Sequence, residues 1–169
     1  MTFNYLRPVL FGSTQASGSQ TMLTVSRIKT LPDDIEVLSA PANLEGLRFV
    51  ARLVDEFRSG SNTFSEPGEA LFEVRVSGEL VAIGGLNVDP YTSSRAVGRV
   101  RRTYVHPEHR SRGIGAALIE AIEKHAHGKF DLLRLRTESE AASRFYVRVG
   151  FSLVSGDPEV SHVKCLRHP

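Results

Sequence analysis

A glycine-bearing segment in the second half of the chain has the composition of a phosphate-binding turn. Residues 110–115 read Arg-Ser-Arg-Gly-Ile-Gly and lie between a strand-like run, Val97–Val105, and a helix-like run at 114–127. A turn that opens a helix presents free backbone N–H groups and the positive end of the helix dipole, and both attract phosphate. Two arginines add positive charge at the same place. The sequence therefore predicts a site for a phosphate-bearing ligand.

Two other phosphate-binding motifs do not match this turn. A dinucleotide-binding fingerprint needs a third glycine where Leu118 stands, and the Gly-Lys-Ser/Thr of a P-loop occurs nowhere in the chain. The glycine spacing alone also suits a tight connection between a strand and a helix, with no ligand. The turn by itself therefore leaves the ligand open.

The elements around the turn are predicted from the spacing of apolar residues. Strands are predicted at residues 23–28, 72–76, 80–88, 97–105, 131–136, 151–154 and 160–166, and helices at 114–127, at 139–149 and within 33–60. Pro41 is expected to divide the last region into two helices, with Asn43 as the N-cap of the second. This order predicts an α/β fold with a mixed central sheet flanked by helices.

Composition restricts the size and the partners of the protein. A chain of 169 residues with 41% apolar content is expected to form one domain. The net charge of +2 indicates no broad polyanion-binding surface, so nucleic acid is not an expected partner. No apolar run approaches the roughly 20 residues that span a bilayer, so no membrane partner is expected. A single cysteine, Cys165, excludes an internal disulfide and fits a reducing cytoplasm, the compartment that we expect.

The first 21 residues are expected to lie outside the folded domain. They lack the long apolar core of a signal peptide, and residues 12–21 are rich in Ser, Gly, Thr and Gln, as flexible segments are. We therefore predict a flexible N-terminal extension at residues 1–21 and a single domain at residues 22–169.

The histidines do not form a convincing metal site. His125 and His127 are two residues apart on a predicted helix and so do not share a face. His106 and His109 lack evident further ligands. We expect no bound metal.

Two segments resemble the GNAT superfamily of N-acetyltransferases. Residues 104–115 resemble its acyl-CoA-binding motif, whose core is Arg or Gln, two residues, Gly, one residue, and Gly or Ala. Residues 145–151, Phe-Tyr-Val-Arg-Val-Gly-Phe, resemble the second motif of the family at the expected distance. With the strand around Gly84-Gly85-Leu86, the resemblance spans about residues 70–155. It implies a mostly antiparallel sheet and transfer of an acetyl group from acetyl-CoA to a primary amine of a small molecule or peptide, by direct attack in a ternary complex.

The same resemblance implies which residues hold acetyl-CoA and which one acts in catalysis. Backbone atoms of residues 111–116 would contact the pyrophosphate, and residues 103–105 would pair with the pantetheine arm like an added strand. Tyr146 would protonate the leaving thiolate, and a backbone N–H near Val105 would bind the developing oxyanion. The implied cofactor-binding residues are Thr103, Tyr104, Val105, Arg110, Ser111, Arg112, Gly113, Ile114, Gly115 and Ala116.

The chain departs from the family pattern at two positions. Many relatives carry a glutamate near the start of the fourth strand, where this chain has Arg99, and an asparagine where it has Ser139. The general base is therefore open, and each candidate also has a structural interpretation as a solvated or hydrogen-bonded residue; the candidates are Glu108, His109, Glu138 and His162. The missing glutamate also keeps open an alternative function, a catalytically idle acyl-CoA-binding or sensing module.

Three arginines on the predicted strand at 97–105 admit several interpretations. Arg99, Arg101 and Arg102 could form salt bridges on a solvated face, assist the CoA phosphates, or attract an acidic acceptor such as an amino acid. Nucleic-acid binding through this strand is a further hypothesis, which the near-neutral total charge argues against.

The acceptor is not encoded in a recognisable motif. The resemblance implies an acceptor pocket built from about residues 41–68, 88–96 and 155–162, where the sequence shows no motif. Folds of this kind commonly dimerise, so a homodimer is one option for the assembly.

Overall fold

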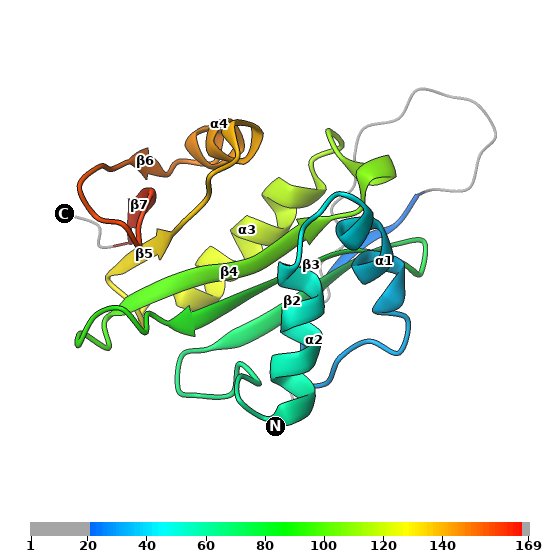
Figure 1. The fold of residues 1–169 in the computed structure, drawn as a ribbon, viewed down its shortest axis with the longest axis horizontal. Coiled ribbons are helices and arrows are strands. Elements are labelled where there is room, and N and C mark those ends of the chain that lie inside the picture. The colour runs from blue at the N-terminus through cyan, green and yellow to red at the C-terminus, as the bar shows by residue number, and fades with distance from the viewer. Residues whose placement is uncertain (1–20, 167–169) are drawn as a thin grey trace.

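The protein is a seven-stranded sheet with helices on both faces, as a computed structural model that describes residues 21–166 shows (Figure 1). The chain order is β1 (Leu23–Ile28), α1 (Glu36–Leu44), α2 (Phe49–Ser59), β2 (Ala70–Val76), β3 (Glu79–Val88), β4 (Val97–Val105), η1 (Pro107–His109), α3 (Ile114–Ala126), β5 (Leu132–Leu135), α4 (Glu140–Arg148), β6 (Ser152–Leu153) and β7 (His162–Cys165). The predicted extension at residues 1–21 lies, except for Thr21, outside the described residues and stays a prediction.

The sheet has the order β1-β2-β3-β4-β5-β7-β6, and every neighbouring pair is antiparallel except β4 with β5. The predicted mixed, mostly antiparallel α/β fold is therefore confirmed. The predicted strand at 97–105 coincides with β4, and the hairpin β2–β3 forms where alternation indicated it.

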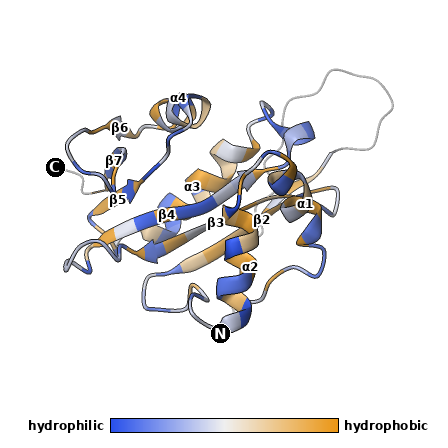
Figure 2. Cartoon of the chain, viewed as in Figure 1, coloured by the Kyte–Doolittle hydropathy of each residue, from blue (hydrophilic) through white to orange (hydrophobic). Residues whose placement is uncertain are grey.

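Each face of the sheet carries its own apolar core. On one face, α3 and α4 bury residues such as Leu118, Ile122 and Tyr146 against the sheet. On the other face, α1 and α2 bury Leu38 and Leu53 together with parts of β2, β3 and β4. Figure 2 shows β4 as a largely hydrophilic strand in the middle of this apolar sheet. Polar side chains at that position need partners or a ligand.

The expected break at Pro41 is wrong. Helix α1 runs through Pro41 and ends three residues later at Leu44, and Asn43 lies in its last turn instead of capping α2. The chain leaves the helix and changes direction at Gly46, whose φ of 74° lies in the left-handed region. The Gly46 N–H donates to Asn43 O (3.0 Å) and the Leu47 N–H donates to Ala42 O (2.9 Å). This pair of hydrogen bonds is typical of a helix that ends at a glycine. The glycine, and not the proline, therefore sets the helix end.

None of the helices within residues 21–166 combines the length and the apolar character needed to cross a membrane.

Candidate functional site

Strand β4 loses its partner on one side partway along its length. It pairs with β5 only over Val97–Arg99, while β4 itself continues to Val105. Among the described residues, no strand pairs with the β5 side of residues 100–105. Figure 1 shows β5 leading away from β4 toward α4. This stretch, which we call the open edge, contains the predicted cofactor-binding residues Thr103, Tyr104 and Val105, and an extended ligand can add to such an edge as a strand does.

The other side of β4 carries a bulge opposite β3. The pairing slips between Ile83 and Gly85, so that β4 contains one extra residue there, and Arg102 takes a left-handed φ of 58°. The bulge lets consecutive side chains leave the usual alternation. Arg102 binds Glu56 of α2, whereas the Thr103 hydroxyl lies near Leu118 of α3 on the opposite face.

The turn before α3 presents a row of free donors. Helix α3 makes its first backbone hydrogen bond from the Ala117 N–H to Gly113 O (3.0 Å). Within the described part of the chain, the backbone N–H groups of residues 111–116 make no hydrogen bond. Arg112 is exposed beside them and forms no ion pair with a described residue. These features have the geometry that phosphate requires at a helix N-terminus.

The two glycines of this turn are needed for different reasons. Gly113 adopts a left-handed φ of 78°, and a Cβ there would meet nothing within 4 Å. A Cβ on Gly115 would lie 3.1 Å from the Phe145 ring, so this glycine makes room for α4. Gly115 therefore packs the turn against the helix that carries Tyr146, and its predicted contact with the cofactor stays a prediction.

The side chain of Arg110 is directed toward α1. Its Nε donates to Val105 O at 3.0 Å, and its two terminal nitrogens each lie 2.8 Å from Glu45. Glu45 also accepts from the Tyr104 hydroxyl at 2.5 Å, and the Arg110 hydrogen bond lowers the pKa of the Glu45 carboxyl. The predicted contact of Arg110 with the cofactor stays a prediction, while in the structure its guanidinium ties α1 to the end of β4.

Tyr146 lies in an aromatic cluster on α4. The residue is 8% exposed, and its ring packs edge-on against Phe145 (5.2 Å between centroids) and Phe151 (5.6 Å). Burial raises the pKa of the phenol, and the nearby Thr103 hydroxyl acts in the opposite direction. That hydroxyl, on the open edge, is buried without a hydrogen-bond partner among the described residues. Tyr146 is therefore a protonated phenol directed toward the open edge.

The four candidate bases occupy separate places. Glu108 is exposed, Glu138 is bound to Arg136 at the surface, and His109 lies 3.9 Å from Glu79. His162 is buried: its Nδ1 lies 2.8 Å from the Ser161 hydroxyl and its Nε2 lies 3.0 Å from the Ser143 hydroxyl. Ser139 accepts a hydrogen bond from the Ala142 N–H as the N-cap of α4. Both ring nitrogens of His162 thus lie within hydrogen-bond distance of serine hydroxyls, and its ring is 6.0 Å from that of Tyr146.

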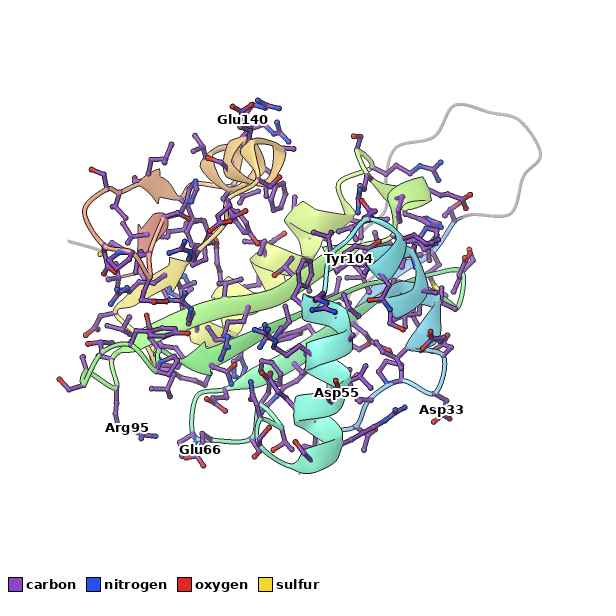
Figure 3. The ribbon with its side chains drawn as sticks, viewed as in Figure 1. Asp33, Asp55, Glu66, Arg95, Tyr104 and Glu140 are labelled. Carbon is purple, nitrogen blue, oxygen red and sulfur yellow. The ribbon has the colours of Figure 1, made fainter. Side chains whose placement is uncertain are left out.

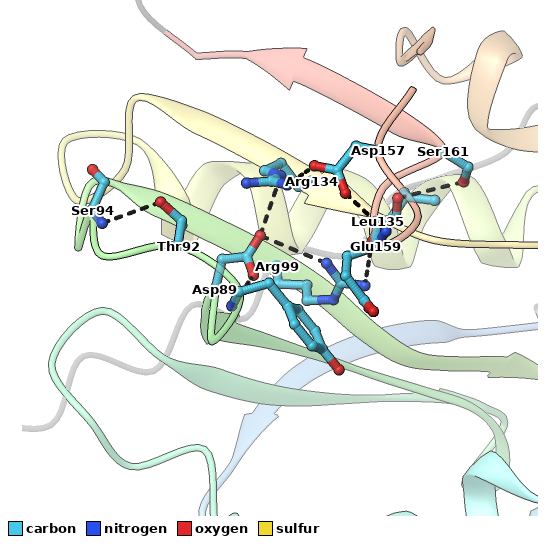
Figure 4. Close-up of polar contacts among 10 residues, drawn as sticks. Asp89, Thr92, Ser94, Arg99, Arg134, Leu135, Asp157, Glu159 and Ser161 are labelled. Atoms are coloured by element: carbon cyan, nitrogen blue, oxygen red, sulfur yellow. Dashed lines mark hydrogen bonds and ion pairs between the residues drawn. The ribbon is translucent and has the colours of Figure 1, made fainter. Parts of the chain in front are cut away.

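Arg99 belongs to a buried ion-pair cluster (Figure 4). Its terminal nitrogens lie 3.6 Å from Asp89 Oδ2 and 2.7 Å from Glu159 O. The same Asp89 oxygen lies 3.3 Å from Arg134 Nε, and Arg134 also binds Asp157 at 2.7 Å. Arg99 and Arg134 are the last paired residues of β4 and β5. Arg99 is thus buried and paired with Asp89 and the Glu159 carbonyl where the open edge begins, although its Nη1 makes no hydrogen bond with a described residue.

A cavity of about 420 Å³ lies on the α2 side of β4. Its lining comes largely from the predicted segments 41–68 and 88–96 and includes Glu56, Glu66, Glu69, Asn87 and Arg101; the predicted segment 155–162 contributes nothing to it. Sequence reasoning missed Glu56 and Glu69. Glu56 has the spacing of an ordinary solvated helix position, and only the fold brings it to β4.

No group of three or more His, Cys, Asp or Glu side chains within residues 21–166 is arranged to hold a metal ion.

Known proteins share both the sequence pattern and the fold of this chain. The family model described as an acetyltransferase (GNAT) domain matches residues 67–153. Aminoglycoside N(6')-acetyltransferase type 1 of Klebsiella aerogenes is 29% identical over 119 residues, which are 69% of this chain and 75% of that protein. The chain belongs to the GNAT acetyltransferase family.

Solved structures agree with this assignment. A structure from Exiguobacterium sp. 255-15, assigned to the acetyltransferases, is 35% identical with a TM-score of 0.73, covering 85% of this chain and 93% of that one. A GNAT-family structure from Desulfovibrio desulfuricans shares the fold at 18% identity, with a TM-score of 0.66 and coverage of 86% and 99%.

Replacing Asp89 should destabilise the protein strongly. In Asp89→Ala, Arg99 stays buried without its carboxylate, so we expect the free energy of unfolding to fall by about 3–5 kcal/mol. Equilibrium urea denaturation measures this. Glu138→Ala, which removes the partner of an exposed ion pair, is the control and should cost at most about 1 kcal/mol. A loss below about 1 kcal/mol in Asp89→Ala would contradict the role of the cluster.

His162 should make the protein less stable in mild acid. Burial lowers the pKa of folded His162 below its ordinary value of 6.5, so below that pH the unfolded chain binds the proton more readily. This contribution to stability is complete above pH 6.5 and is lost as the pH falls toward the lowered pKa. His162→Gln should therefore lose less stability than the wild type between about pH 7.5 and about pH 5.5, in urea titrations. Burial also lowers the pKa of His125, so some pH dependence should remain. If His162→Gln and the wild type lose the same stability between these pH values, the lowered pKa of His162 is refuted.

Proposed function

We propose that the protein transfers an acetyl group from acetyl-CoA to a primary amine by direct attack in a ternary complex. The observation that carries this proposal is the juxtaposition of the open edge, the free N–H groups of residues 111–116 and the Tyr146 phenol. The pyrophosphate would bind the N–H row, and the pantetheine arm would pair with residues 103–105. The Klebsiella relative, by its name, acetylates an amino group, which supports nitrogen as the acceptor atom.

The chemical step needs a nucleophile on one side of the thioester and an acid near its sulfur. The neutral amine nitrogen attacks the thioester carbon, a C–N bond forms and the C–S bond breaks. The proton that the nitrogen gives up passes to solvent, which returns one to Tyr146. Tyr146 supplies the proton that the leaving thiolate takes up. Because its pKa is raised, the phenol stays protonated throughout the neutral range. Tyr146 lies on the α3 and α4 side of the sheet, and the acceptor would reach the open edge from the cavity on the α2 side.

The alternative is an acyl-CoA-binding module without turnover, in keeping with Arg99 at the position where relatives carry glutamate. Release of free CoA with a panel of amines separates the two functions. An enzyme releases CoA in proportion to acetylated amine, whereas a binding module shows a thermal shift with acetyl-CoA and no release.

Tyr146→Phe should lower kcat by about 100-fold or more, because proton donation contributes about that much to such steps. Acetyl-CoA should raise the melting temperature of the variant as it does that of the wild type. Val147→Ala, at a half-exposed residue of the same helix, is the control and should retain wild-type kcat. Wild-type turnover of Tyr146→Phe, measured where chemistry limits the rate, would refute the role.

Gly113→Ala should weaken acetyl-CoA binding. The left-handed backbone costs alanine about 1–2 kcal/mol, and relaxation of the turn would displace the N–H row, so we expect KM for acetyl-CoA to rise roughly tenfold. Gly128→Ala is a close control at the other end of α3, because Gly128 has a φ of 75° and equally open surroundings. Both variants should lose similar stability in urea. Equal KM values for the two variants would contradict a phosphate site at Gly113.

A further inference from the structure

The cavity on the α2 side of β4 contains a carboxylate oxygen without a partner. Glu56 binds Arg102 through Oε1 at 2.7 Å. Its other oxygen, Oε2, is buried and has no hydrogen-bond partner among the described residues. An orphan acceptor of this kind is costly unless a ligand donates to it. Glu56 is also one of the residues that line the cavity, so its unpaired oxygen lies beside the space that a ligand would occupy.

The same cavity contains an arginine without a counterion. Arg101 lines the cavity and is partly buried, yet within the described chain it makes neither a hydrogen bond nor an ion pair. Burial, and then the charge of Arg102, lower the pKa of Arg101, and the charge of Glu56 offsets this only in part. A planar guanidinium binds a carboxylate through two parallel hydrogen bonds. An anionic group in the cavity would therefore stabilise Arg101.

The other polar groups of the cavity already have partners. Glu69 is buried and accepts from the Val88 N–H (3.0 Å) and the Glu66 N–H (3.2 Å). The Asn62 and Asn87 amides bond to each other, at 3.1 and 3.0 Å.

Glu66 is largely exposed and lies 3.8 Å from Arg95, and Figure 3 shows both side chains at the edge of the molecule. The unmatched groups of the cavity are thus one carboxylate oxygen and one guanidinium.

We infer that the acceptor is an amine that also carries a carboxylate, such as an amino acid or a short peptide, with its ammonium on Glu56 and its carboxylate on Arg101. The cavity volume of about 420 Å³ lies in the range of small-molecule sites, roughly 300–1,000 Å³. A polycation would place a further ammonium against Arg101. The inference rests on the proposed function, because it concerns the substrate of that reaction.

The test compares amines that differ only in the carboxylate. Amino acids are assayed against their decarboxylated amines, and dipeptides against their C-terminal amides, by release of free CoA. For the wild type we expect kcat/KM to be at least about tenfold higher for the members with a carboxylate, which is the discrimination that one charged hydrogen-bonded contact provides. Spermidine and kanamycin represent the polycations.

Arg101→Gln should remove this preference. Its kcat/KM for the carboxylate members should fall roughly tenfold, while that for the decarboxylated amines and the amides should stay near the wild-type value. Arg101→Lys should be intermediate, because it keeps the charge and loses the bidentate geometry. Arg52→Gln, at an exposed arginine of α2 outside the cavity, is the matched control and should change neither class. Because Arg101 has no partner to lose, the variants should keep the wild-type melting temperature.

The outcomes separate this inference from the proposed function. Equal or better turnover of decarboxylated amines or polycations by the wild type would overturn the inference and leave acetyl transfer intact. An unchanged preference in Arg101→Gln would also overturn it. A thermal shift with acetyl-CoA but no turnover of any amine would refute the acceptor class and favour the binding module. If acetyl-CoA causes no thermal shift and no amine is turned over, the proposed function itself is refuted.

Discussion

The contact between Asp89 and two arginines determines where the sheet opens. Arg99 and Arg134 face each other as the last registered pair of β4 and β5, and two guanidinium groups side by side would repel. The buried Asp89 carboxylate lies between them, and Asp157 and the Glu159 carbonyl complete the cluster. The strands are thus held together up to this pair and separate beyond it. The open edge exists because β4 is paired with β5 up to Arg99 and, within residues 21–166, has no partner strand on that side beyond it.

Gly115 connects the two parts of the proposed acetyl-CoA site, which are the turn with free N–H groups and the helix that carries Tyr146. Gly115 belongs to the turn with free N–H groups, and the Phe145 ring occupies the space that a Cβ would need there. Phe145 in turn packs edge-on against Tyr146. The distance between a phosphate site and the phenol is therefore set by helix packing, which is rigid, and not by a loop. Such a device suits a reaction in which a long donor must place its thioester reproducibly.

Much of the fold was predictable because its determinants are local. The alternation of apolar residues located β4, and two glycine-containing motifs located the turn and the helix of Tyr146. The end of α1 was missed because the left-handed Gly46 outweighs the local preference of Pro41. The acidic residues of the cavity were missed for another reason: a carboxylate on α2 has no local mark that distinguishes a solvated position from one that faces β4.

The arginines of β4 show why residue type alone could not assign the acceptor. On a regular strand, Arg99 and Arg101 would share one face and Arg102 would occupy the other. The bulge at Arg102, which no glycine marks in the sequence, directs its side chain to Glu56 on the α2 face instead. Arg102 thereby takes one oxygen of Glu56, and Asp89 with Glu159 takes Arg99. Arg101 is left over as the cation that faces the cavity. The chemistry that we propose for the acceptor thus follows from which arginine the fold leaves unpaired, and that depends on one extra residue in one strand.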